Sequence, residues 1–335
     1  LKAVGGQYNS FQNTPQLLPL VDRSLVKSTE SIIESQITPY SFQTETSIAE
    51  WHYLIGQKYK SAKEIIELLM QNVSRNGTML LNITQHGRGD LDTGVVRICK
   101  DIGAWLKVNG EAVYGSRPFE VFGDNSVVYT RNQGNVYATL LNWDGKTVTL
   151  SALHTGGTTL GKVSKVEMLG SDSPLKYTQD DQGLTISPDG PSQIMSGITD
   201  HSLASMCRVL RITHDKGWFN DDDPGVKAPG WLRKCNLGTG DFNNDLTTSD
   251  TPGEIWSCSF TGTNVAVVAP KEAGAGKIEI RIDGKKYATA DLSVTGTRQA
   301  QQVVCKISGL ALKEHSISIV NMGSGPVAID ALVIK

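Results

Sequence analysis

A short apolar run, Met79-Leu80-Leu81, lies between two amphipathic segments and constrains the fold of this chain more than any other feature. An apolar run of this length is typical of a strand that is covered on both faces, and such strands occur mostly in parallel sheets flanked by crossover helices. We therefore expect one helix before the run and another after it. Residues 59–109 would then form a helix, a strand and a second helix, which is an α/β arrangement.

Both flanking segments carry helix signals. Ser61 and Glu64 have the spacing of a capping box, in which each side chain satisfies a free backbone donor of the other residue. Gly77 supplies the stop of this helix, and residues 95–106 repeat the helical spacing before a second stop at Gly110. The apolar positions of the first helix are Ile65, Ile66, Leu68, Leu69 and Val73.

The sequence pattern changes near residue 110, where short strand-like runs separated by Gly, Asn and Asp replace the helical period. Asp144-Gly145 and Asp283-Gly284 each lie between two such runs and are typical of hairpin turns. This spacing predicts antiparallel β-sandwiches. We expect one sandwich over residues 111–195 and a second, jelly-roll-like sandwich over residues 200–335.

Charge and hydropathy limit the possible partners. A formal net charge of -2 without a basic run argues against nucleic acid and against an anionic membrane surface. No apolar stretch approaches the roughly 18 residues that a membrane span requires. The chain begins with Leu1 and shows no signal-peptide pattern, so we expect it to continue a longer protein that is encoded upstream.

The sequence shows no convincing metal or redox motif. The five cysteines lack CxxC spacing, and both buried free thiols and one or two disulfides beyond residue 200 are compatible with their positions. Residues 241–252 resemble a calcium loop, yet Leu246 and Pro252 stand where the loop needs glycine and glutamate. Residues 220–225, with the sequence NDDDPG, fit a solvated turn better than the alternative, a metal site. We therefore expect no metal and no organic cofactor.

Several motifs follow one another in residues 30–125: "PYSFQTETSIAEWHY", "YKSAKEIIELLMQNVSRNGTMLLN" and "IGAWLKVNGEAVYGSRP". In this order they resemble the closing part of the catalytic barrel of α-L-fucosidases, glycoside hydrolase family 29. The resemblance implies a multidomain α/β plus all-β protein, with the C-terminal part of a (β/α)8 TIM-like barrel over residues 1–110 followed by the two sandwiches. It also implies hydrolysis of terminal α-L-fucose from fucosylated glycans with retention, and a secreted or periplasmic location.

The resemblance places one catalytic carboxylate in this chain. Retaining glycosidases use two carboxylates roughly 5 to 5.5 Å apart, one as the nucleophile and one as the acid and base. The nucleophilic aspartate of the family lies on an earlier barrel strand, which we expect upstream of Leu1. Glu30 corresponds to the acid/base position, because it lies twelve residues before Phe42, which occupies a tryptophan position of the family. The alternative for Glu30 is a solvated loop carboxylate, as we expect for Glu34 and Glu45.

Phe42, Trp51 and Asn82 are the candidates for substrate contact. Trp51 matches an aromatic position that the family places against the apolar side of fucose. Asn82 lies toward the carboxyl end of the apolar strand, the end at which barrel enzymes keep their chemistry. A packing role for Trp51 and a hydrogen bond from Asn82 to a neighbouring loop are the alternatives. In the second sandwich, the tryptophans can either form a sugar-stacking platform or fill the core: Trp218, Trp231 and Trp256.

Two classes of function follow from these patterns. The first is the C-terminal portion of a retaining α-L-fucosidase. A complete barrel takes about 250 residues, so we expect this chain alone to be inactive. The second is a non-catalytic carbohydrate-binding or adhesion protein with a vestigial barrel segment. No oligomeric state is indicated for either class.

Overall fold

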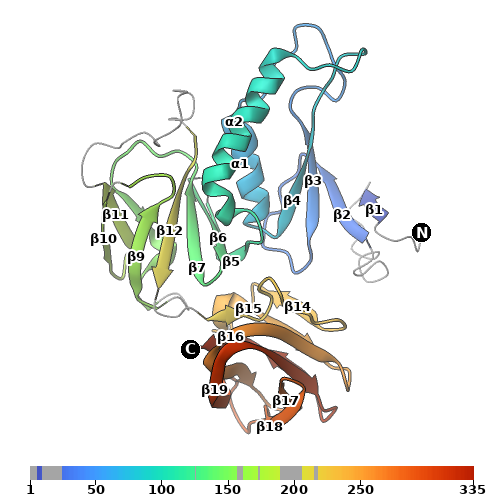
Figure 1. Ribbon diagram of the computed structural model, residues 1–335, viewed down its shortest axis with the longest axis vertical. Coiled ribbons are helices and arrows are strands. Elements are labelled where there is room, and N and C mark those ends of the chain that lie inside the picture. Colours follow the sequence, from blue (N-terminus) through green and yellow to red (C-terminus); the bar gives the residue numbers. More distant parts are fainter. Residues whose placement is uncertain are drawn as a thin grey trace.

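The computed structural model describes residues 6–9, 25–124, 126–156, 161–172, 174–188, 206–214 and 218–335. These residues form five sheets and two α-helices (Figure 1). Both α-helices lie between one sheet and a sheet-rich unit, and a second sheet-rich unit lies below these parts. Neither described α-helix is long and apolar enough to cross a membrane. Short 3-10 helices occur at Gly110–Ala112 (η1), Ser151–Leu153 (η2) and Phe242–Asn244 (η4).

The N-terminal unit is a four-stranded sheet in the order β1-β2-β3-β4, and every pair in it is parallel. Its elements are β1 (Gly6–Asn9), β2 (Leu25–Glu30), β3 (Phe42–Ser47), α1 (Ala62–Val73), β4 (Gly77–Asn82) and α2 (Thr93–Asn109). The helix, strand and helix predicted over residues 59–109 are confirmed.

The predicted capping box is present at the start of α1. The backbone N–H of Ser61 donates to Glu64 Oε2 at 2.7 Å, and the backbone N–H of Glu64 donates to Ser61 Oγ at 3.2 Å. The Ser61 backbone N–H, followed by the Ser61 hydroxyl, lowers the pKa of Glu64. This local pair fixes where the helix begins, so its apolar side meets the sheet.

The helices cover only one face of the parallel sheet. Met79 and Leu81 pack with Ile65 of α1 and Val95 of α2, whereas Leu80 points to the opposite face and is 42% exposed. The prediction that this strand is covered on both faces is therefore wrong for the described part of the chain. The reason is that α1 and α2 both pack on the side of Met79.

The middle unit is a sandwich of a five-stranded sheet, β5-β6-β7-β12-β9, and a three-stranded sheet, β10-β11-β8. Apolar residues of both sheets form one core, among them Val136, Leu150, Ile186 and Ile212. The strands are β5 (Arg117–Gly123), β6 (Val127–Asn132), β7 (Asn135–Leu140), β8 (Val148–Leu150), β9 (Val163–Met168), β10 (Leu175–Gln179), β11 (Leu184–Pro188) and β12 (Arg208–His214).

Strand β12 corrects the expected boundary at residue 200. It lies in the range predicted for the last sandwich, yet it pairs antiparallel with β7 and with β9 in the middle sandwich. Ile212 lies opposite Val136 on one side and Val166 on the other, so apolar contacts hold the strand in place. Trp105 of α2 is completely buried and donates its indole N–H to the carbonyl of Cys207 at 2.8 Å, which joins the helical unit to the same segment.

The last unit also consists of two sheets around one core, ordered β13-β21-β16-β19-β17-β18 and β14-β15-β20. Trp231 and Trp256 are 3% and 0% exposed within this core, as the packing alternative predicted. The strands are β13 (Phe219–Asn220), β14 (Leu232–Cys235), β15 (Asp245–Ser249), β16 (Ile255–Lys271), β17 (Lys277–Ile282), β18 (Lys285–Asp291), β19 (Gln299–Asn321), β20 (Val327–Ile329) and β21 (Ala331–Ile334). All five cysteines are free thiols.

Candidate active site

The uncovered face of the parallel sheet carries polar side chains toward the carboxyl ends of its strands. In the strand register Glu30 lies opposite Glu45, Glu45 lies opposite Leu80, and Ser47 lies opposite Asn82. Since alternate residues of a strand share a face, these five side chains lie on the face that α1 and α2 leave open. A polar surface at this edge of a parallel sheet is where α/β proteins place ligands.

Glu30 and Trp51 contact each other directly at this edge. Glu30 is the last residue of β2 and is exposed, and Trp51 donates its indole N–H to Glu30 Oε1 at 2.7 Å. The next residue, Ser31, has a φ of 52° and donates its backbone N–H to the carbonyl of Glu45 at 2.8 Å, so the chain turns away at this point. Trp51 is 41% exposed, so its ring keeps a free surface beside the carboxylate.

Asn82 supports the segment that carries Trp51. Its amide donates to Ser47 Oγ at 3.0 Å and to the backbone carbonyl of Trp51 at 3.2 Å. This is the loop hydrogen bond that the alternative for Asn82 predicted. Through it, Asn82 positions the tryptophan that orients Glu30, so the structure brings together three of the four predicted site residues.

Phe42 does not join this group. It is the first residue of β3, at the amino end of the strand, and its side chain is completely buried. A Cβ on Gly77 would lie 2.4 Å from Phe42 Cζ, so the ring fills the space above that glycine. The expectation that Phe42 contacts substrate is corrected here, because a fully buried ring at the opposite end of the strand has no surface to offer.

Sequence reasoning missed Glu45, which it treated as an exposed loop carboxylate. Glu45 lies inside β3, is half-buried and accepts a hydrogen bond from Ser28 Oγ at 2.6 Å. It occupies the register position beside Glu30, and Gln43 shares its face. The alternation of Phe42 and Thr44 with Gln43 and Glu45 was the available signal, since it is typical of a strand with two different faces.

The loop after β4 is stiffened by a polar network. His86 contacts Asp90 through Nδ1 at 2.6 Å and Asp92 through Nε2 at 3.0 Å, and Tyr59 donates its hydroxyl to Asp92. The hydrogen bond to Asp90 raises the pKa of His86 despite some desolvation. Hydrogen bonds from Arg88 and His86 lower the pKa of Asp90 to about 2. These contacts hold the loop at the carboxyl end of β4.

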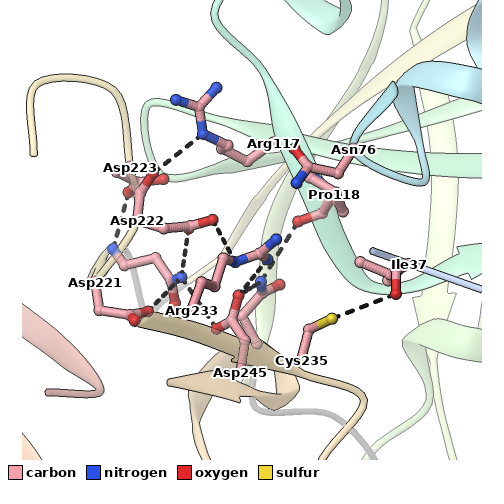
Figure 2. A network of polar contacts seen from close by, with 12 residues as sticks. Ile37, Asn76, Arg117, Pro118, Asp221, Asp222, Asp223, Arg233, Cys235 and Asp245 are labelled. Atoms are coloured by element: carbon pink, nitrogen blue, oxygen red, sulfur yellow. Dashed lines mark hydrogen bonds and ion pairs between the residues drawn. The ribbon is translucent and has the colours of Figure 1, made fainter. Parts of the chain in front are cut away.

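A second polar cluster joins the last sandwich to the other two units (Figure 2). Asp222 lies 2.7 Å from Arg233 Nε and also pairs with Arg131 of β6, while Asp245 lies 2.5 Å from Arg233 Nη2. Asp221 is completely buried beside them. The solvated turn predicted over residues 220–225 is therefore wrong at its aspartates, because Asp221 and Asp223 are buried and arginines from distant strands pair with Asp222 and Asp223.

The cluster contains three carboxylates that are close enough to share a metal ion, but their oxygens already accept hydrogen bonds and form ion pairs. Carboxylate oxygens of Asp221, Asp222 and Asp245 lie within 4.8 Å of one another. The amide of Asn220 donates to all three, at 2.8, 2.8 and 3.1 Å, and Arg233 binds the latter two. A hard cation would need these same oxygens and would lie beside a guanidinium. The geometry thus fits an ion-pair network better than a cation cage.

The pKa directions agree with that assignment. Burial raises the pKa of Asp222, but Arg233 and Arg131 outweigh burial and hold it below its ordinary value. Burial raises the pKa of Asp221 well above its ordinary value, and the neighbouring Asp245 and Asp222 add to the rise. The burial of Asp221 thus favours its neutral form, whereas the two arginines favour the ionised form of Asp222.

Asp330 provides a pH-dependent test of the packing in the last sandwich. It is completely buried and accepts the backbone N–H of Phe242 at 2.8 Å. Burial, followed by the nearby Asp241 carboxylate, raises the pKa of Asp330 to about 8. An unfolded aspartate titrates near pH 3.9, so between about pH 4 and pH 8 the folded state holds a proton that the unfolded state has lost. The stability contributed at this position therefore falls as the pH rises through that window.

We expect Asp330→Asn to gain stability relative to the parent protein as the pH rises from 5 to 8, because the amide does not titrate. Urea unfolding at pH 5, 6.5 and 8 measures the difference in the free energy of unfolding. Asp291→Asn is the matched control, since hydrogen bonds from Ser293 lower the pKa of the exposed Asp291 and leave it ionised across this range. A difference for Asp330→Asn that stays constant with pH would contradict the expectation.

Residues 13–111 match the family model described as alpha-L-fucosidase, and residues 123–197 match the model described as the alpha-L-fucosidase C-terminal domain. The chain belongs to the α-L-fucosidase family. The two matches follow each other in the order of the parallel sheet and the middle sandwich.

Named relatives match part of this family member. It is 34% identical over 145 residues to the tissue alpha-L-fucosidase of Rattus norvegicus, which is 41% of this chain and 30% of the relative. It is 38% identical over 129 residues to the tissue alpha-L-fucosidase of Homo sapiens, which is 37% of this chain and 27% of the relative. The chain thus spans about a third or less of each of these relatives.

One solved structure resembles the whole fold. The alpha-L-fucosidase from Vibrio sp. strain EJY3 has a TM-score of 0.51 at 18% identity, covering 97% of this chain and 60% of that chain. At this identity the similarity concerns the fold alone. It extends over all the units, including the last sandwich, which neither family model covers.

Proposed function

We propose that this chain is the C-terminal portion of a retaining α-L-fucosidase that removes terminal α-L-fucose from fucosylated glycans. The observation that carries the proposal is the hydrogen bond between Trp51 and Glu30 at the carboxyl edge of a parallel sheet, within the segment that matches the fucosidase family model. The named relatives are fucosidases, so the non-catalytic alternative, a carbohydrate-binding or adhesion protein, is not favoured.

In this proposal the parallel strands β1 to β4 are the last strands of a (β/α)8 barrel. Their parallel order, the helix between β3 and β4 and the polar open face support it, because strands placed against that face would enclose Glu30 and Glu45. We divide the protein into the barrel part over residues 1–110, a sandwich that begins at residue 111 and includes β12, and the last sandwich from residue 218. A secreted or periplasmic location belongs to the same proposal and rests on the sequence resemblance alone.

The residues at this edge would act in two steps. Glu30 protonates the oxygen of the departing group while a nucleophilic carboxylate from outside this chain bonds to the sugar. Glu30 then takes a proton from the water that releases fucose. Trp51 holds one Glu30 oxygen and offers its ring to the apolar side of the sugar, and Asn82 fixes the segment that carries Trp51. No cofactor takes part in these steps.

Turnover of a chromogenic fucoside, 4-nitrophenyl α-L-fucoside, tests the proposal. We expect activity with retention of configuration from the protein that includes the sequence encoded upstream of Leu1, and none from residues 1–335 alone, because one of the two carboxylates is missing. Nuclear magnetic resonance of the first sugar released reports the configuration. An inactive longer protein would overturn the hydrolase proposal, and clear activity of residues 1–335 alone would overturn the incomplete site.

A further inference from the structure

We propose that a groove between the middle and last sandwiches binds a neutral sugar unit of a glycan, at a site separate from the edge that holds Glu30. This cavity of about 380 Å³, which we call the junction groove, has the size of a small-molecule site. Its walls include Tyr114, Asn132 and Gln133 on the middle side and Trp218, Phe219 and Asp223 on the other. The class of ligand rests on the proposed function, because a glycan hydrolase meets sugars beyond the one it cleaves.

The aromatic walls of the junction groove are both open and held in place. Tyr114 is 64% exposed, and a Cβ on Gly110 would lie 2.9 Å from its Cδ2, so one edge of the ring rests on the end of the helical unit. Trp218 is partly exposed and packs against Phe242 with ring centroids 5.3 Å apart. Rings fixed in this way lose little conformational entropy when a ligand stacks on them.

The polar wall lies on the turn between β6 and β7. Asn132 donates its amide to the carbonyls of Glu111 and Tyr114, at 2.9 and 3.2 Å, so it holds the turn that presents the tyrosine. Gln133 is exposed at the tip, where its φ of 48° and the φ of 74° at Gly134 form a tight hairpin turn. The Gln133 amide supplies donors and acceptors for hydroxyl groups.

Charge pairing selects a neutral ligand. Asp223 is the only acidic or basic residue among those that line the junction groove in the described chain, and Arg131 neutralises it. A groove without a free cation gives no advantage to a phosphate or a nucleotide. A pyranose sugar matches these walls, because it can place the apolar face of its ring against the aromatic side chains and direct its hydroxyl groups toward the amides.

The junction groove borders the last sandwich, which lies at the opposite end of the parallel strands from the proposed catalytic edge. The last sandwich contacts the segment just before β3, where Asn236 donates to the carbonyl of Ile37 at 2.7 Å. That segment leads to the amino end of the parallel strand, whereas Glu30 and Trp51 lie at the carboxyl end. Figure 1 shows the last sandwich below the parallel sheet. A sugar in the groove would therefore anchor a glycan without entering the fucose site.

Isothermal titration of the protein that includes the upstream sequence, with lactose, N-acetyllactosamine, cellobiose and mannobiose as probes, tests this site. These disaccharides carry no fucose, so hydrolysis does not interfere. We expect at least one to bind, and Tyr114→Ala to weaken it about tenfold. Tyr287→Ala is the matched control, because Tyr287 is 51% exposed on the distant β18. Gln133→Ala, at an exposed tip, repeats the test without removing a ring.

The outcomes separate this inference from the proposed function. The proposed sugar site is supported if Tyr114→Ala and Gln133→Ala weaken disaccharide binding and leave the turnover of 4-nitrophenyl α-L-fucoside unchanged. Failure of all four disaccharides to bind overturns it, as does equal weakening of the binding by Tyr287→Ala. If turnover fails while Tyr114-dependent binding persists, the hydrolase proposal falls and the sugar site stands.

Discussion

Glu30→Gln, made in the protein that includes the upstream sequence, is expected to lower turnover of fucosides with poor leaving groups by about 10²- to 10⁴-fold. The amide is too weak an acid to protonate the departing oxygen, yet its carbonyl oxygen can still accept the indole N–H of Trp51, so the local geometry is kept. A leaving group that is already a weak base needs no proton. Turnover of 4-nitrophenyl α-L-fucoside should therefore suffer much less in its first step than turnover of a fucosyl disaccharide.

The comparison of leaving groups separates a catalytic acid from a residue that only shapes the site. Steady-state kcat and kcat/KM on both substrates provide the measurement. Glu34→Gln, four residues further along the chain, is the control and should leave both values unchanged. Glu45→Gln serves as the competitor, because Glu45 lies beside Glu30 in the strand register. If the loss that depends on the leaving group follows Glu45→Gln instead, our assignment of the acid is wrong.

Arg233→Ala is expected to destabilise the protein by about 3 to 5 kcal/mol, the cost of removing one partner from a buried ion pair. The guanidinium is 11% exposed and contacts the carboxylates of Asp222 and Asp245, which are 13% and 0% exposed. The variant leaves the carboxylates of Asp222 and Asp245 without Arg233, in a buried cluster that also contains Asp221. Burial lowers the pKa of Arg233, but Asp222 and Asp245 raise it further, so the arginine is charged at every pH of the experiment.

Urea unfolding followed by circular dichroism measures this loss of stability. The fluorescence intensity of the buried tryptophans is a second probe, because several units can unfold separately. Arg281→Ala is the matched control, since Arg281 is 42% exposed and pairs with Glu279 at the surface. It should cost about 1 kcal/mol or less. Similar losses for the two variants would show that the cluster around Arg233 does not secure the junction.

The elements that sequence predicted well are those whose causes are local. The capping box joins residues three apart, and the hairpin between β17 and β18 needs only Asp283 and Gly284, whose φ values of 49° and 76° suit a two-residue turn. The helical stripes likewise repeat within a few residues. In these places propensity and packing favour the same conformation, so the pattern alone was sufficient.

The elements that sequence predicted poorly depend on residues far along the chain. The aspartates after Asn220 form a typical solvated turn until Arg131 and Arg233 approach from other strands. The sequence predicted that Leu80 is buried, because the apolar run from Met79 to Leu81 does not reveal that α1 and α2 cover the same face of the sheet. The contact between Glu30 and Trp51 joins positions 21 residues apart, and no spacing rule gives its direction.

The position of β12 decides where this protein can be divided. Arg208–His214 lies between β7 and β9, so its ladder bonds hold both neighbours. A truncation near residue 200 would remove a middle strand and expose two sheet edges at once, and such edges readily pair with other chains and aggregate. A soluble piece without the last sandwich must therefore keep the sequence through His214.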